Sequence, residues 1–390
     1  MKNTKLRNLF ILLGSTLSVL QGAIVAPALP KISEHFAGIE NIEFLSKLIL
    51  AISPLFLALF SPFAGNLLEK YGRKRVLIIA SILYAFAGTT GFYLDNIYLI
   101  LVGRALLGMT ISALMSGFIV VLGDLYKGDE LNKYMGIQGA LMSFGGMLFL
   151  IIGGILAEIS WNLPFIGYLF SLVIAVGLLF FLDETKPNNT TEIKNKPSKI
   201  VLNKDIIMLN VMAFCVMAIY LMIPTQLPFL LVKLFSLSNK EIGGYLALWI
   251  FSSSLASISY SKVRKLLSNK QIYMFGFLIW SIGYLILFSS NSIMMILIGL
   301  FFSGVGNGYV IPNLKTELLE NVSEFQRGKQ SGLFTASLYF GQFFSPILIQ
   351  PIIKSFNIQF PFLIISIILI LFTLLYFFLN KKAVNNNFNK

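Results

Sequence analysis

Residues 65–75 read GNLLEKYGRKR and separate two apolar stretches, residues 46–66 and 75–94. Gly72 permits a tight turn, and Gly65 lets neighbouring helices approach each other closely. Four basic residues crowd this short segment: Lys70, Arg73, Lys74 and Arg75. The segment therefore predicts a short, strongly basic turn between two apolar helices.

The apolar stretches beside this turn belong to a pattern that runs through the whole chain. Of its 390 residues, 56% are hydrophobic and only 12% are charged, and the mean hydropathy is +0.81. A soluble protein has about 25% charged residues, so this composition excludes a set of soluble domains. A helix needs about 20 apolar residues to cross a bilayer. Twelve stretches reach or approach that length, and we expect each to span a membrane: 8–30, 46–66, 75–94, 97–122, 136–157, 162–182, 206–232, 241–260, 272–289, 292–312, 330–352 and 358–379.

Basic residues are unequally distributed between the two sides of the predicted membrane. With an even number of spans and both termini inside, the inner segments hold 24 of the 30 lysine and arginine residues. The outer segments hold five: Lys31, Lys47, Lys233, Lys240 and Lys354. This bias follows the positive-inside rule, so we expect a multi-pass protein of the cytoplasmic (inner) membrane with both termini cytoplasmic. The net charge of +13 is then an orientation signal, and we expect no nucleic-acid partner.

The two halves of the chain match at a constant offset of 196 residues. Residues 100–108 read ILVGRALLG and residues 296–304 read ILIGLFFSG, and the same offset aligns Asp124 with Glu320. A parallel repeat of this kind places the substrate site between the halves, near the membrane midplane. We therefore expect an all-α integral membrane protein of twelve transmembrane helices in two six-helix halves. The expected boundaries are 1–182 for the N-terminal half, 183–205 for a cytoplasmic linker, and 206–390 for the C-terminal half with a short cytoplasmic tail.

The segment at 65–75 also resembles the signature loop between helices two and three of the major facilitator superfamily. That loop has a glycine, three residues, an acid, a base, one residue, a glycine, an arginine and two more bases; Glu69 and Lys70 stand at its acidic and first basic positions. The resemblance covers about residues 8–380 and implies the major facilitator fold. It also implies that Asp124 is the partner acid of Arg73, and that an Asp124–Arg73–Glu69 cluster holds the inner face closed. The alternative is that the bases only follow the positive-inside rule.

Arg104 is the one basic residue that we place well inside a predicted span. A buried arginine costs at least about 2.5–3.5 kcal/mol on insertion scales, so by default it marks a functional site. The Arg104-x-x-x-Gly108 spacing resembles the superfamily's fourth-helix motif, whose arginine is linked to proton transfer. The equivalent position in the second half is Leu300, so the scaffold does not require a base there. We expect Arg104 to couple protons or orient cargo; the alternative is a structural anchor to backbone carbonyls.

Prolines recur at matching places in spans one and seven. Leu20-Gln21-x5-Pro27-x-x-Pro30 resembles a motif of the drug:proton antiporter group, and span seven repeats the pair of prolines. Proline removes a backbone donor and loosens a helix, so we expect bending at these positions and at one equivalent position in span eleven. The residues concerned are Pro27, Pro30, Pro224, Pro228 and Pro346.

Span five keeps the spaced glycines of the same antiporter group. Small residues of this kind let helices approach closely in a membrane. The group's Gly-Pro pair is replaced here by Phe149-Leu150, so obligatory antiport stays open. The glycines are Gly136, Gly139, Gly145, Gly146, Gly153 and Gly154.

Polar residues inside the spans form the expected cargo-facing surface. A mostly apolar cavity with a few polar groups suits amphipathic or drug-like molecules, although phenylalanine and methionine also fill ordinary helix contacts. All seventeen acids lie in loops or at predicted helix ends, so we do not expect selection for cations, and Arg104 favours neutral or anionic cargo. The polar set comprises Gln21, Gln138, Gln226, Asn307, Asn313, Tyr339 and Gln342.

These features favour a secondary active transporter that works by alternating access, in the form of proton-coupled efflux of amphipathic small molecules. An importer, symporter or facilitator of a small metabolite on the same fold is the alternative, and a membrane sensor or membrane enzyme is a remote one. One cysteine, Cys215, and one histidine, His35, leave little for metal binding, so we expect no metal, no cofactor and no catalytic site. The expected partners are a small-molecule substrate, protons and the lipid bilayer, with the protein as a monomer.

Overall fold

The computed structural model describes residues 4–184, 204–322 and 327–388, and within these ranges the chain is helical, with no strand. Twelve helical segments of the described chain are long and apolar enough to cross a membrane, which confirms the predicted spans. The predicted linker, 183–205, lies outside the described residues except at its two ends.

Spans one to six are formed by α1 (Thr4–Ser15), α2 (Leu17–Ala23), η1 (Ala26–Ala28) and α3 (Leu29–His35), then α4 (Ile42–Tyr71), α5 (Arg73–Gly88) with α6 (Thr90–Tyr93), α7 (Ile97–Leu125), α8 (Gly128–Ile159), and η2 (Leu163–Leu169) with α9 (Phe170–Phe181). Spans seven to twelve are α10 (Lys204–Phe235), α11 (Asn239–Leu266), α12 (Asn269–Phe288), α13 (Ile293–Asn321), α14 (Arg327–Ser355) and α15 (Phe360–Phe388).

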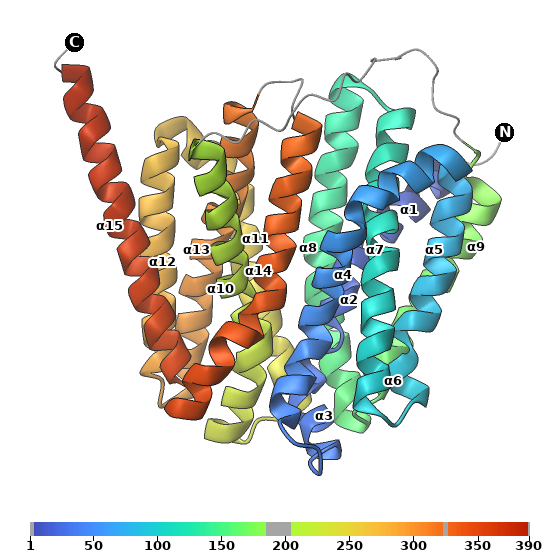
Figure 1. Cartoon of the computed structure of the whole chain (residues 1–390), viewed down its shortest axis with the longest axis horizontal. Helices are drawn as coiled ribbons and strands as arrows, with labels where there is room; N and C mark the ends of the chain where they lie inside the picture. The colour runs from blue at the N-terminus through green and yellow to red at the C-terminus, as the bar shows by residue number, and fades with distance from the viewer. Residues whose placement is uncertain (1–3, 185–203, 323–326, 389–390) are drawn as a thin grey trace.

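The two sets of six spans stand side by side (Figure 1), the N-terminal half on the right and the C-terminal half on the left. The main contacts between them pair α4 with α14 and α8 with α11. The first helix begins and the last helix ends at the same end of the bundle (Figure 1), as an even number of spans requires. We call this the inner end, because the basic turn at 65–75 also lies there, and we call the opposite end the outer end.

Span one is interrupted at its prolines, whereas spans seven and eleven continue through theirs. Pro27 lies in the 3-10 turn η1, and Pro30 lies in the first turn of α3. Proline has no N–H to donate, so the α-helical ladder is broken here. Pro224 and Pro228 lie inside α10, and Pro346 lies inside α14, and both helices continue through them. Bending at these last three positions stays a prediction.

Contacts between helices repeat at the same offset as the sequence. A Cβ atom on Gly108 would collide with the backbone carbonyl of Ser53, and one on Gly304 would collide with that of Trp249. Both members of the second pair follow those of the first by 196 residues. In each half, a glycine thus lets the fourth helix approach the second closely.

The halves touch at the outer end and stand apart at the inner end. A Cβ on Gly154 of α8 would lie 2.6 Å from the carbonyl oxygen of Asn239. A Cβ on Gly243 of α11 would lie 2.5 Å from the carbonyl oxygen of Leu150 in α8. Gly136 shares the face of Gly154, because five turns of about 3.6 residues separate them, yet a Cβ there would meet no atom of the described chain within 4 Å. Ser261, five turns from Gly243 on α11, is exposed. The structure is therefore closed at its outer end and open at its inner end.

Candidate functional site

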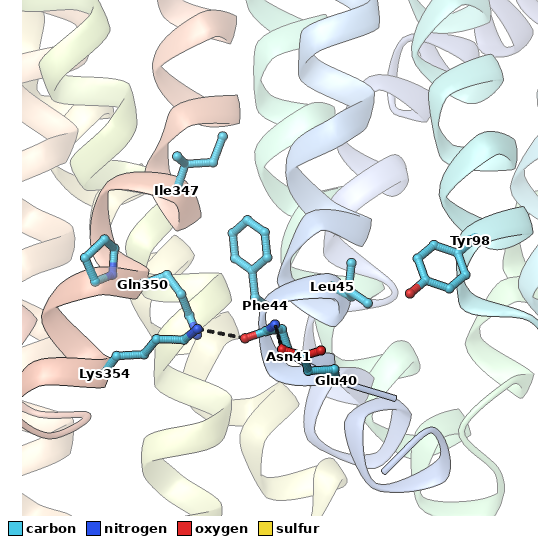
Figure 2. Close-up of a pocket in the computed structure, with 9 residues that line it drawn as sticks. Glu40, Asn41, Phe44, Leu45, Tyr98, Ile347, Gln350 and Lys354 are labelled. Atoms are coloured by element: carbon cyan, nitrogen blue, oxygen red, sulfur yellow. Dashed lines mark hydrogen bonds between the residues drawn. The ribbon is translucent and has the colours of Figure 1, made fainter. Parts of the chain in front are cut away.

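Hydrogen bonds between the two halves seal the outer end. Glu158, at the end of α8, accepts bonds from the backbone N–H groups of Asn239 (2.9 Å) and Lys240 (3.4 Å), which begin α11. The first N–H groups of a helix have no partner within it, so a carboxylate there is favourable. The Lys354 ammonium of α14 donates to the side-chain oxygen of Asn41 at the start of α4 (2.7 Å; Figure 2). The bond from Glu158 to the second half was not predicted from the sequence.

A crevice of about 630 Å³ remains beside this seal, between α4 and α14 (Figure 2). Phe44 of α4 and Tyr98 of α7 line it from the N-terminal half, and Gln350 and Lys354 line it from the C-terminal half. The crevice therefore marks, at the outer end, the seam along which the two halves meet.

Arg73 and Asp124 join the inner ends of α5 and α7. Arg73 Nε lies 3.2 Å from Asp124 Oδ2, and Arg73 Nη1 donates to the carbonyl of Leu68 (3.2 Å). Arg73 begins α5 directly after Gly72, whose φ of 87° lies in the region that favours glycine. Glu69 is exposed near the end of α4, and the described contacts of Arg73 do not include it. The pair joins two helices of one half while the inner ends stand apart, so this contact alone does not close the inner face.

The basic turn is also tied to the end of span six and to the residues directly after it. The backbone N–H of Lys74 donates to Glu184 Oε1 (3.2 Å), and the Lys74 ammonium donates to the carbonyl of Leu179 (2.8 Å). A Cβ on Gly72 would collide with the Glu184 carboxylate. Glycine at this position therefore serves both the turn and the approach of Glu184.

The other residues of the signature segment lie at its surface. Lys70 stands over the ring of Tyr71, 5.2 Å from its centre, and Arg75 is exposed. A Cβ on Gly65 would meet no atom of the described residues within 4 Å. In this closed-outside arrangement, the close helix approach expected at Gly65 is not seen.

The C-terminal half has its own version of the Arg73–Asp124 contact. Glu320 at the end of α13 accepts bonds from Asn269 Nδ2 (2.7 Å) and from Arg264 Nη2 (3.0 Å). Asn269 and Glu320 follow Arg73 and Asp124 by the same 196 residues. Both halves thus fix the inner end of their fourth helix to the start of their third.

Arg104 is completely buried in α7 and bonds to three other spans. Its Nε donates to the carbonyl of Ile49 in α4 (2.9 Å), Nη1 donates to the Tyr168 hydroxyl (2.5 Å), and Nη2 donates to the carbonyl of Gln21. The Tyr168 hydroxyl donates to the same Gln21 carbonyl (2.8 Å). Gln21 lies in the last turn of α2, where carbonyls have no partner within the helix. This geometry supports the structural-anchor interpretation of Arg104: it joins spans one, two and six to span four.

Four members of the predicted cargo-facing set are engaged within the protein. Gln138 donates to Ser15 Oγ (2.6 Å), Gln342 contacts Met217 Sδ (3.6 Å), and Tyr339 donates to Met115 Sδ across the two halves (3.2 Å). Asn313 accepts from the Tyr260 hydroxyl (3.1 Å) and donates to the Asn269 carbonyl (3.1 Å) at the inner end. Asn313 therefore has a packing role near the Glu320 contact.

The other three members of the set are buried amides with unused hydrogen-bonding groups. Gln226 in α10 is completely buried, and neither its Nε2 nor its Oε1 has a hydrogen-bond partner among the described residues. Gln21 Oε1 and Asn307 Nδ2 are also buried without a partner in this part of the chain, although Asn307 Oδ1 accepts from Ser253 (2.6 Å). A buried amide without a partner costs about 1–3 kcal/mol, so these groups are suited to a partner from outside the protein.

Lys47, expected in an outer segment, lies inside α4 and is completely buried. Its ammonium stands 4.8 Å from the centre of the Phe229 ring in α10, across the seam between the halves. The nearest carboxylate, that of Glu43, is 3.9 Å away, and no hydrogen-bond partner of the ammonium lies within the described residues. In the sequence, this site is marked by a lysine at the edge of the predicted second span, 46–66.

Comparison with known proteins supplies family relationships for this arrangement. The family model described as Major Facilitator Superfamily matches residues 11–266 and 211–390. The chain is 23% identical over 350 residues to the tetracycline resistance protein, class H, of Pasteurella multocida, covering 87% of both chains. It is 24% identical over 377 residues to the bacillibactin exporter of Bacillus subtilis (strain 168), covering 91% of this chain and 92% of that one.

The crystal structure of a D-xylose-proton symporter shares the fold, with a TM-score of 0.80. The two chains are 16% identical, and the match covers 95% of this chain and 96% of the symporter. At this identity the likeness concerns the arrangement of helices alone.

Proposed function

The chain belongs to the major facilitator superfamily and is a transporter, and from this premise we propose that it exports amphipathic small molecules by alternating access, driven by protons. We also propose that the inner end faces the cytoplasm, in line with the positive-inside rule. In the described conformation, cargo would enter from the inner end while the outer seal is closed.

The three buried amides with unused groups carry this proposal. Gln21, Gln226 and Asn307 come from spans one, seven and ten, so both halves contribute to the set. A binding site between the halves can open first to one side and then to the other as the halves rock. Cargo that bonds these amides would offset the cost of burying them. Leu20 and Leu227, which adjoin Gln21 and Gln226 in the chain, are buried apolar residues, and apolar residues beside a few polar groups favour amphipathic molecules.

The relatives support export as the direction of transport. The tetracycline resistance protein and the bacillibactin exporter both match over nearly their full length. An importer on the same fold remains the second candidate, because the D-xylose-proton symporter has the same arrangement of helices. Cargo accumulation in right-side-out vesicles would favour the importer and contradict export.

We propose that protons from the outer side act on the outer seal through Glu158, which sets how readily the outer end opens and does not itself carry the exchanged proton. It is an acid that bridges the two halves, and its charge strengthens the two backbone bonds that it accepts from α11. Lys31 lies close by, donating to the Glu158 backbone carbonyl (2.8 Å). Protonation of the Glu158 side chain would weaken the outer seal and so favour opening to the outside.

Everted membrane vesicles with an acidic interior test this function. Adding an amphipathic cargo should raise the internal pH as protons leave in exchange, and the response should be slower in Glu158→Gln, whose outer seal no longer responds to protonation. Lys354→Met, which removes another bond of the outer seal without removing an acid, is the matched control and should keep the response. Uptake of labelled cargo without any pH change would overturn proton coupling and leave a facilitator.

A further inference from the structure

We propose that Lys47 and Gln226 form a recognition point for the anionic group of an amphipathic cargo. This inference rests on the proposed transport function and adds to it the chemical class of the cargo: an apolar, aromatic body that carries a carboxylate or a similar anion. The two residues belong to α4 and α10, which lie in different halves. An anion held between them would therefore contact both halves of the bundle.

The first observation is a buried ammonium without a hydrogen bond. Lys47 has no exposed surface, and its three donors find no acceptor among the residues that the structure describes. Glu43, at 3.9 Å, is too distant for a hydrogen bond, and its side chain is 55% exposed, so water competes for it. The ring of Phe229 supplies the contact from the other half, a cation–π interaction.

The second observation is a buried amide one turn deeper on the facing helix. Because α10 runs from the inner to the outer end, Gln226 lies nearer to the membrane centre than Phe229. Residues three apart share one face of a helix, so Gln226 lies on the side of α10 that carries Phe229 toward Lys47. Both of its side-chain polar atoms are without a partner in the described chain.

The balance of donors and acceptors selects an anion. An ammonium has three donors and no acceptor, and a glutamine amide has two donors and one carbonyl oxygen. A ligand that satisfies both must therefore be rich in acceptors, and a charge of opposite sign also offsets the burial of the ammonium. Leu227 and Leu230 are completely buried beside Phe229, so the body of the ligand should be apolar.

The same geometry gives the anion a route of release. Opening of the outer end separates α4 from α10 and breaks the contact between Lys47 and Phe229. Water then reaches the ammonium, and Glu43, one turn nearer to the outer end, is placed to pair with it. Cargo would thus lose its counter-ion when the site faces outward, which favours release.

Equilibrium binding to the full chain in phosphatidylcholine nanodiscs tests the inference without requiring transport. The probes are 1-pyrenebutyrate and its uncharged analogue 1-pyrenebutanol, followed by energy transfer from the three tryptophans. Lys47→Met should weaken binding of the anion by about tenfold or more, because a charged hydrogen bond is lost, and should leave the alcohol unchanged. Lys47→Arg should retain most of the preference. Lys354→Met, whose lysine already has Asn41 as a partner, is the control and should change neither affinity.

The possible outcomes separate this inference from the exporter proposal. Equal loss of both probes in Lys47→Met, or no loss of either, would overturn the anion site. Removing a buried charge should not impair folding, and an unchanged thermal unfolding midpoint would verify this. If the wild-type protein prefers the anion but vesicles transport no amphipathic compound, export is refuted and the recognition point stands.

Discussion

A methyl group added at Gly154 should drive the transporter away from its outer-closed arrangement. In Gly154→Ala, the new Cβ would lie 2.6 Å from the carbonyl oxygen of Asn239 and 3.2 Å from the Cα of Gly243. Both are backbone atoms of α11, so no side-chain rotation relieves the collision. Opening of the outer end relieves it, because that movement separates α8 from α11.

The structure gives the size of the effect. Ordinary van der Waals contact begins at 3.4 Å, so the two helices must separate by about 0.8 Å, and overpacking of this kind costs about 1–3 kcal/mol. That free energy lowers the ratio of outer-closed to outer-open molecules by about 5- to 150-fold. Gly136→Ala is the matched control, because it makes the same change on the same face of α8 with no described atom within 4 Å.

Labelling of a single cysteine measures the shift. In a Cys215→Ser background, Ala247→Cys places a thiol one turn deeper than Gly243 on the same face of α11, where the residue is 4% exposed. A membrane-impermeant maleimide added outside should react faster in Gly154→Ala than in Gly136→Ala. Equal rates in the two variants would refute the argument that the glycine contact holds the outer end closed.

Three further substitutions test other contacts. Arg104→Leu should lower the stability of the detergent-solubilised protein by about 3 kcal/mol or more, because several buried groups lose a charged partner; a thermal midpoint that stays unchanged while transport is lost would instead support a coupling role. Asp124→Asn should lower the free energy of unfolding by only about 1 kcal/mol, because the Asp124 side chain is 30% exposed. It should also speed hydrogen exchange at the start of α5, and unchanged exchange would contradict the anchoring of Arg73. Gln226→Leu should stabilise the protein by about 1–3 kcal/mol while it weakens cargo binding, and a loss of stability would show that the amide has a partner within the fold.

The number and order of the spans could be predicted from the sequence because each span needs a long apolar run. The ends of the helices could not, since hydropathy detects only the part inside the hydrocarbon core. The second span, expected at 46–66, extends over Ile42–Tyr71, and the fifth, expected at 136–157, extends over Gly128–Ile159. This extension moves Lys47 from the edge of the predicted span to more than one turn inside the helix.

The part of the candidate site that belongs to a recognisable sequence motif could be predicted. The resemblance to the signature loop paired Arg73 with Asp124, and the structure brings them to 3.2 Å. The partners of Arg104 include backbone carbonyls, which no residue pattern marks. The cation–π contact between Lys47 and Phe229 depends on how the two halves pack together. Hydropathy does not predict which residues meet across the two halves.

A bundle joined at its outer end and parted at its inner end occupies less area in one leaflet than in the other. Each transport cycle must transfer cross-section between the leaflets, so it performs mechanical work against the lateral pressure of each. Leaflet tension then acts as an effector without a binding site, because it stabilises one of the two states over the other. Lipids whose shape compresses the outer leaflet should retard opening to the outside, and the same protein with the same cargo should turn over at different rates in bilayers of different curvature stress.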